Sequence, residues 1–76
     1  MQRDIFRRLD RIDHLIRIKG TGTPAQFADK VGLSERTMYA YLRLMKDFGA
    51  PVVYSRQKQS YYYLRGGRFI VRFLSE

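Results

Sequence analysis

A chain of 76 residues has the size of one domain with one small hydrophobic core. It has no cysteine and one histidine, which excludes disulfides, thiolate metal sites and a histidine cluster, so apolar packing must stabilise the fold. Fifteen Lys and Arg against seven Asp and Glu give a net charge of +8, which makes polyanions the expected partners.

The basic residues are unevenly distributed. Residues 30–68 carry eight basic and two acidic side chains, whereas residues 1–29 carry six and four. A nucleic-acid-binding surface is therefore expected in the second half of the chain. No stretch approaches the ~20 apolar residues of a membrane-spanning helix, and the first residues are charged rather than forming a secretory apolar core. We expect a cytoplasmic, nucleoid-associated protein without membrane contact.

The first apolar pattern predicts an amphipathic helix over about residues 3–18. Apolar side chains recur there every three or four residues, and they are Ile5, Phe6, Leu9, Ile12, Leu15, Ile16 and Ile18. His14 lies among the polar positions of this helix, and we assign it no function.

Thr23, Pro24 and Gln26 predict the start of a second helix, as an N-cap, a proline at the first helical position and a capping-box glutamine. Gly32 predicts its end, because glycine readily adopts positive φ. A phosphate contact by Thr23 and Gln26 is the alternative to the capping box, which we favour.

Ser34 predicts the N-cap of a third helix, which begins after a short turn and ends near residue 48, before Gly49 and Pro51. Its apolar positions Met38, Leu42 and Met45 share one face. Two helices joined by a glycine-containing turn form a helix-turn-helix, here over about residues 24–48.

The tail predicts a β-hairpin, the wing, over about residues 52–65. Residues 52–54 and 61–64 are β-prone, and a polar loop separates them. The expected fold is therefore α+β, a winged helix-turn-helix of three helices and a hairpin, as a single domain over residues 1–76. The alternation in residues 69–73 predicts a short third strand or a dimer contact.

Three motifs resemble the DeoR-like winged helix-turn-helix of bacterial repressors, especially the one that precedes WYL-domain regulators, over about residues 7–68. They are Ser34-Glu35-Arg36-Thr37-Met38-Tyr39, Phe48-Gly49-Ala50-Pro51-Val52 and Tyr62-Tyr63-Leu64. The resemblance implies a transcriptional regulator that binds DNA. It also implies that Tyr62 and Leu64 point inward and that Tyr61 and Tyr63 point outward.

The sequence departs from that family at two places. Ala40 and Tyr41 stand where the family often has Arg-Asp, and the wing lacks the usual glycines, so the operator cannot be inferred. The ligand-sensing domain that normally follows is absent from these 76 residues. The chain is therefore either a protein without an evident effector site or an excised N-terminal domain.

The residues expected to contact DNA lie on the third helix and the wing. At 100° per residue, Arg36, Tyr39, Ala40 and Arg43 point away from Met38, with Thr37 at the margin. A helix fits the major groove, where an arginine can bind guanine bidentately. The full DNA-binding set is Ser34, Arg36, Thr37, Tyr39, Ala40, Arg43, Arg56 and Lys58.

Each of these assignments has an alternative. Ser34 is first a helix cap, although a helix N-terminus also receives phosphate. Arg56 and Lys58, on the wing, either follow the DNA backbone or minor groove or simply keep an exposed hairpin from pairing edge to edge.

The expected function is sequence-specific binding of double-stranded DNA by a bacterial or phage regulator. One alternative is a protein-interaction module, and another is single-stranded nucleic-acid binding by outward-facing Tyr61 and Tyr63. We expect no enzyme, because no catalytic constellation or phosphate-binding glycine loop is present, and no cofactor, metal or small-molecule effector. A homodimer through the first helix or the C-terminal segment remains open.

Overall fold

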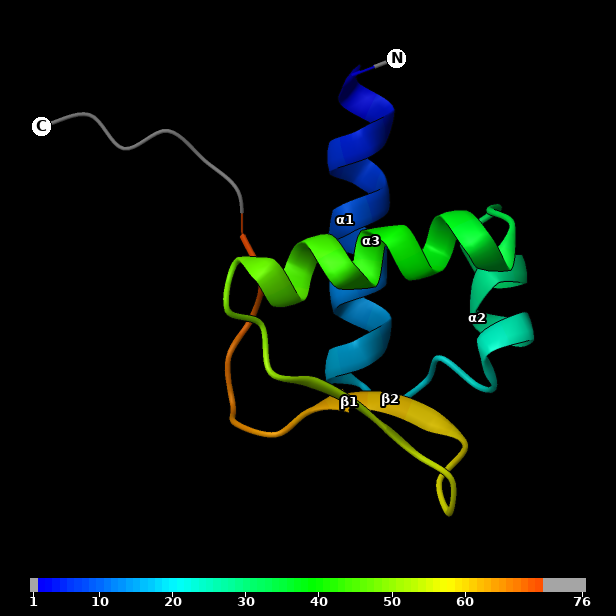
Figure 1. Cartoon of the computed structure of the whole chain (residues 1–76), viewed down its shortest axis with the longest axis vertical. Helices are drawn as coiled ribbons and strands as arrows, with labels where there is room; N and C mark the ends of the chain where they lie inside the picture. Colours follow the sequence, from blue (N-terminus) through cyan, green and yellow to red (C-terminus); the bar gives the residue numbers. More distant parts are fainter. Residues whose placement is uncertain (1, 71–76) are drawn as a thin grey trace, which may run out of the picture.

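The computed structural model describes residues 2–70, with side chains from residue 5 onward, and is an α+β arrangement. Its elements are α1 (Gln2–Arg17), α2 (Pro24–Lys30), α3 (Glu35–Asp47), β1 (Val52–Ser55) and β2 (Ser60–Tyr63) (Figure 1). The strands form one antiparallel hairpin. The three helices and the hairpin follow the order that the sequence predicts.

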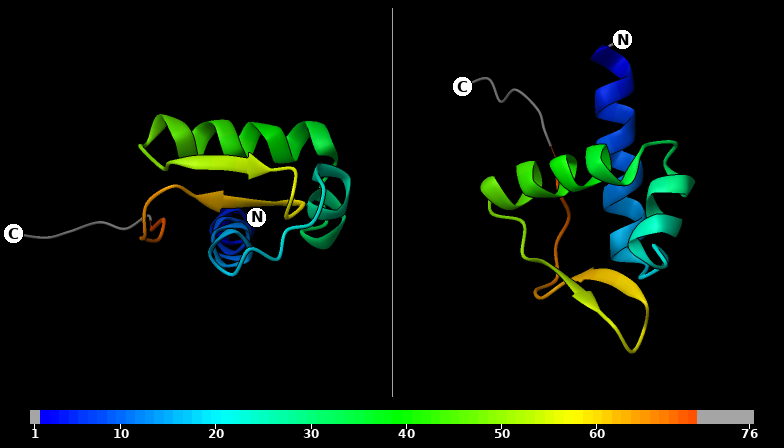
Figure 2. Two further views of the ribbon diagram at one scale, coloured as in Figure 1. Left: turned by 90° about the horizontal axis from the view of Figure 1, so that it is seen from below. Right: turned by 45° about the vertical axis from the view of Figure 1, so that its right-hand side comes forward.

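The helices and the hairpin surround one core. In Figure 1, α3 crosses in front of α1, α2 packs beside one end of α3, and the hairpin lies below. Seen from below, β1 lies on the α3 side of the hairpin and β2 on the α1 side (Figure 2). Each strand is therefore supported by a different helix.

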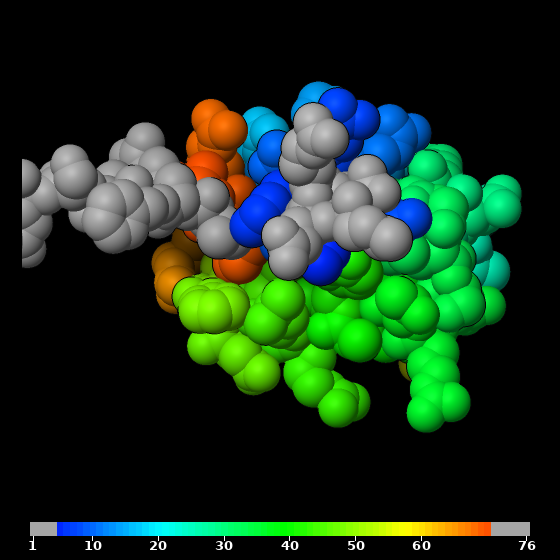
Figure 3. Space-filling model, turned by 90° about the horizontal axis from the view of Figure 1, so that it is seen from above, coloured from blue at the N-terminus to red at the C-terminus, as the bar shows by residue number. Residues whose placement is uncertain are grey.

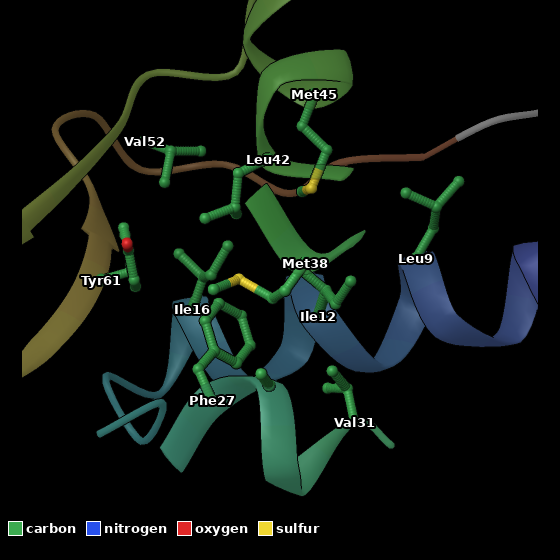
Figure 4. Packing of buried hydrophobic residues seen from close by; sticks show 11 residues of the cluster. Leu9, Ile12, Ile16, Phe27, Val31, Met38, Leu42, Met45, Val52 and Tyr61 are labelled. Carbon is green, nitrogen blue, oxygen red and sulfur yellow. The ribbon is translucent and has the colours of Figure 1, made fainter. Parts of the chain in front are cut away.

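The core draws side chains from every element (Figure 4). Phe27, Ile12, Ile16, Met38 and Met45 are fully buried. Burial on this scale is the main stabilising force available to the chain, at about 1.5–3 kcal/mol for each large apolar side chain.

The apolar stripe of α1 is shorter in the structure than in the sequence pattern. Ile5, Phe6 and Ile18 are 44%, 51% and 56% exposed, whereas Leu9, Ile12 and Ile16 are buried. The reason is geometric, because the first turns of α1 project beyond α3 and Ile18 lies after the end of the helix (Figure 1).

All three helices end in the same hydrogen-bond motif. This is the Schellman motif. In α1, the amide of Gly20 donates to the carbonyl of Leu15 at 2.9 Å, and the amide of Lys19 donates to the carbonyl of Ile16 at 3.1 Å. This motif requires a left-handed residue just after the helix. Glycine takes that place after α2 and α3, at Gly32 and Gly49. After α1 the left-handed residue is Lys19, with φ 56°, which is strained for a side chain with a Cβ.

The hairpin register contradicts the prediction for the tyrosines. Tyr61 pairs with Tyr54 and Tyr63 with Val52. Tyr61 is buried and Tyr63 is half-buried against the core, whereas Leu64 is 63% exposed. Tyr61 and Tyr63 therefore face inward, and the outward orientation that the family resemblance implied is wrong. Side chains alternate between the two faces of a strand. A shift of one residue in the comparison with the family therefore assigns every side chain of the strand to the opposite face.

Hydroxyl groups fix this register where β2 begins. The loop between α1 and α2 places Thr21, which is fully buried, against Ser60. The amide of Tyr61 donates to Oγ1 of Thr21 at 2.8 Å, and the amide of Thr21 donates to Oγ of Ser60 at 3.2 Å. These bonds hold the start of β2 against the helices and thereby direct the Tyr61 ring toward Phe27, with the ring centroids 5.5 Å apart.

The chain leaves the hairpin through an exit segment, residues 64–70, which is not a strand. A third strand was predicted over residues 69–73, but Phe69 and Ile70 lie outside any strand, and residues 71–73 lie outside the described residues. The amide of Phe69 instead donates to Oδ1 of Asp13 at 2.7 Å, because that buried carboxylate of α1 needs donors. Its other donors are the Tyr63 hydroxyl at 2.7 Å and Nε of Arg17 at 2.8 Å.

Replacing Lys19 with glycine should stabilise the fold. Removing the Cβ from a left-handed position relieves about 1 kcal/mol of strain, which corresponds to a rise in Tm of roughly 4–8 °C for a domain of this size. Thermal unfolding followed by circular dichroism measures the change. The matched control is Lys46→Gly, an exposed lysine within α3, which should lower stability by about 0.5–1 kcal/mol. A lower Tm for Lys19→Gly would contradict the assignment of strain to this residue.

Candidate nucleic-acid interface

The exposed face of α3 carries the residues that the sequence assigns to DNA contact. Burial of Met38, Leu42 and Met45 fixes the rotation of the helix about its axis. Arg36, Thr37, Tyr39, Ala40 and Arg43 are consequently exposed. Figure 3 shows α3 (green) along one side of the molecule with side chains projecting into solvent. The short Ala40 side chain lies between the two arginines, which leaves room for close approach to the helix.

The start of α3 is locked by its cap. Oγ of Ser34 accepts a hydrogen bond from the amide of Thr37 at 3.1 Å and donates to its Oγ1 at 3.0 Å. The capping role predicted for Ser34 is confirmed. The same bond orients Thr37 at the edge of the exposed face.

The predicted capping box at the start of α2 is also confirmed. The amide of Thr23 donates to Oε1 of Gln26 at 2.9 Å, and the amide of Gln26 donates to Oγ1 of Thr23 at 3.3 Å. Because both side chains satisfy main-chain groups of their own helix, their structural role accounts for their presence.

The hairpin loop presents the second pair of predicted residues. Arg56 and Lys58 are exposed at the tip, and Oγ of Ser55 accepts a hydrogen bond from the amide of Lys58 at 3.2 Å. Gln59 closes the turn with φ 50°. The tip projects from the molecule at the same end as α2 and the start of α3 (Figure 1). The loop is thus a defined turn with two cations at its end.

The cations of both surfaces lack partners within the part of the chain whose side chains are described. Among residues 5–70, no ion pair and no hydrogen bond involves the side chain of Arg36, Arg43, Arg56 or Lys58. The ion pair found among these residues joins Arg17 to Asp13. The charge of the four cations is therefore available to an anionic ligand. Among those same residues no group of metal-ligating side chains occurs, and no described helix is long and apolar enough to cross a membrane.

An aromatic cluster that the sequence pattern does not predict joins α3 to the hairpin. The Tyr61 ring lies 4.9 Å from that of Tyr54, centroid to centroid. Burial, and to a smaller extent the neighbouring hydroxyl of Tyr39, raise the pKa of Tyr61 from 10.0 to about 12. Tyr39 is 44% exposed, so it belongs both to this cluster and to the outer face of α3. Tyr54 and Tyr61 are cross-strand partners in the hairpin. Two tyrosines at paired positions would indicate such a cluster once the strand register is known.

Alkaline pH should destabilise the protein through two tyrosines. Burial, and then the hydrogen bond to Asp13, raise the pKa of Tyr63 well above its ordinary value, as burial does for Tyr61. The unfolded chain releases these protons near pH 10 and the folded chain does not. The stability that these groups contribute is therefore complete below pH 10 and is lost progressively as the pH rises toward about 12 for Tyr61.

Urea unfolding at a series of pH values measures this loss, with tyrosinate absorbance reporting ionisation. Tyr61→Phe and Tyr63→Phe should each make the decline of the unfolding free energy above pH 10 less steep. A free energy of unfolding that stays constant across this range in the unsubstituted protein would refute the explanation.

The chain matches no protein-family model, no curated protein and no solved structure. The resemblance to DeoR-like domains stays a prediction from the motifs.

Proposed function

We propose that this chain is a winged helix-turn-helix domain that binds double-stranded DNA, with α3 in the major groove and the hairpin loop against the adjoining backbone or minor groove. The observation that carries the proposal is the exposed face of α3, where Arg36 and Arg43 are unpaired within the described residues. The net charge of +8 supports a polyanionic partner.

Arg36 and Arg43 suit the reading of bases. They lie seven positions apart on one face, which corresponds to about 10 Å along the helix axis. Each guanidinium can donate two hydrogen bonds to O6 and N7 of a guanine, worth roughly 1–3 kcal/mol of discrimination. Thr37 and Tyr39 flank this pair and suit contacts with phosphate or a thymine methyl group.

Arg56 and Lys58 suit a different role. At the tip of a turn they reach phosphates or a narrow minor groove, where binding depends mainly on charge. We assign affinity to the wing and sequence preference to α3. By its resemblance to repressor domains, the protein is proposed to be a bacterial or phage transcriptional regulator.

Stacking of single-stranded bases on the hairpin is less well supported. That alternative needed outward-facing Tyr61 and Tyr63, but Tyr61 is 7% exposed and its ring packs on Phe27 and Tyr54. The hydroxyl of Tyr63 is bonded to Asp13. Neither ring is free to stack on a base.

The first test compares nucleic acids. Fluorescence anisotropy with random duplex DNA, single-stranded DNA and RNA across a salt series should show preference for the duplex. The logarithm of the affinity should fall with the logarithm of salt concentration, with a slope of about −0.9 for each phosphate contacted. Tighter binding to single strands, or no duplex binding at low salt, would overturn the proposal.

Variants then distinguish recognition of bases from sequence-independent attraction by charge. After selection of a preferred site from a random duplex pool, Arg36→Ala and Arg43→Ala should each reduce preference for that site by roughly 5- to 150-fold. Lys58→Ala should weaken all duplexes alike and reduce the salt slope by about one unit.

The matched control is Arg7→Ala. Arg7 is exposed on α1, on the side opposite the buried residues Leu9, Ile12 and Ile16, so its loss should alter neither preference nor slope by a comparable amount. Equal, sequence-independent losses from Arg7, Arg36 and Arg43 would show that α3 does not read bases.

A further inference from the structure

A groove of about 490 Å³ lies beside the end of α3, away from the residues proposed to contact DNA. Phe48 and Pro51 form one side, and the exit segment (residues 64–70) forms the other. The end of α3 and the exit segment lie side by side in Figures 1 and 3, and the rings of Phe48 and Phe69 are 6.3 Å apart. None of the eight residues of the DNA-binding set lines this groove.

The groove is apolar and open. Phe48 is 71% exposed and Ile70 is 50% exposed, although both are large hydrophobic side chains. Exposing them to water is unfavourable, and clustered apolar side chains with a polar rim are typical of interaction sites. Phe48 lies after the end of α3 and outside the core cluster, so most of its apolar surface faces solvent.

Both sides of the groove are fixed in position. Oδ1 of Asp13 accepts hydrogen bonds from the hydroxyl of Tyr63 and the amide of Phe69, each at 2.7 Å. The amide of Leu64 donates to the carbonyl of Pro51 at 2.9 Å, which joins the exit segment to the chain that follows α3. A groove held in this way loses little conformational entropy when a ligand binds.

The charge at the groove is positive. Arg65 and Arg68 are among its lining residues, and among the residues that the structure describes no aspartate or glutamate lines it. An adjoining hollow shares Tyr63 and Arg65 and adds Lys19 and Arg17, the latter paired with Asp13. Within the described side chains, Arg65 and Arg68 have no ion pair. An apolar surface bordered by cations is complementary to an apolar side chain flanked by carboxylates.

We propose that this groove binds a short acidic segment of a partner protein, in which an aromatic or aliphatic side chain stands next to aspartate or glutamate. The apolar side chain lies against Phe48 and Ile70, and the carboxylates pair with Arg65 and Arg68. This site is independent of the proposed DNA binding, because it uses other residues at another end of α3.

Charge argues against a second copy of the chain as the occupant. A two-fold symmetric contact would bring the same patch of both copies together and place Arg65 and Arg68 near their counterparts. Like charges at an interface disfavour association, and each copy has a net charge of +8. Nucleic acid would satisfy the arginines but would leave Phe48 and Ile70 without an apolar partner.

The test uses the full chain and a fluorescein-labelled peptide, Gly-Ser-Asp-Phe-Glu-Asp-Leu-Glu-Ser-Gly. One control peptide replaces its phenylalanine and leucine with serine, and a second replaces its acidic residues with lysine. Anisotropy should show saturable binding of the first peptide, at least tenfold weaker binding of the serine peptide and none of the lysine peptide. Amide NMR shifts should change at Phe48 and in residues 65–70 rather than at Arg36 and Arg43.

Protein variants locate the site. Phe48→Ser and the double change Arg65→Ala with Arg68→Ala should each weaken the acidic peptide about tenfold, whereas Phe6→Ser and Arg56→Ala should leave it unchanged. Phe6 is the matched control because it is an aromatic residue on α1 with 51% exposure. Circular dichroism verifies that each variant is folded.

Three results would overturn the proposal. The first is absence of peptide binding, and the second is equal binding of the serine peptide, which would indicate attraction of polyanions alone. The third is a concentration-dependent dimer in sedimentation that Phe48→Ser abolishes, because the groove would then be an interface between copies.

Discussion

The arrangement of this protein depends on the insertion of one face of α3 into the core. Met38, Leu42 and Met45 pack among α1 and α2, and no disulfide is present to supply stability in another way. With 3.6 residues per turn, burial of these three positions necessarily exposes Arg36, Ala40 and Arg43. The apolar pattern that folds the chain thereby also sets the direction of the candidate binding residues. A change that rotated α3 would disturb the core and the exposed face together.

Two polar junctions attach the hairpin to this helical core. A two-stranded hairpin alone is marginally stable in water, so it needs support beyond its own ladder. Thr21 and Ser60 provide that support where β2 begins, and Asp13 provides it where β2 ends, through Tyr63. Tyr61, between the two junctions, is buried as a result. The hairpin loop is therefore held at a defined place relative to α3, as a second contact surface would require.

The helices and their caps could be predicted because their signals are local. The Thr23–Gln26 capping box and the Ser34 cap each join residues three positions apart. The inward direction of Tyr61 and the role of Asp13 could not be predicted. They depend on hydrogen bonds whose partners are separated in the sequence by 40, 50 and 56 positions. Sequence patterns identify a buried acid only through its partners, and those partners come together only on folding. The exposure of the candidate residues on α3 was predictable for the same reason as the helix, whereas the groove at its end was not.

The position of Phe48 connects the two proposed surfaces. It follows α3 directly, so the helix that carries Arg36 and Arg43 on its middle turns also forms one wall of the groove at its end. Asp13 fixes the opposite wall through Phe69 and is itself buried next to the core residue Ile12. A ligand in the groove therefore contacts elements packed against the same core that orients α3, without covering its exposed arginines. Because the two proposed surfaces use different residues, we expect a DNA duplex and an acidic peptide to bind one molecule at the same time.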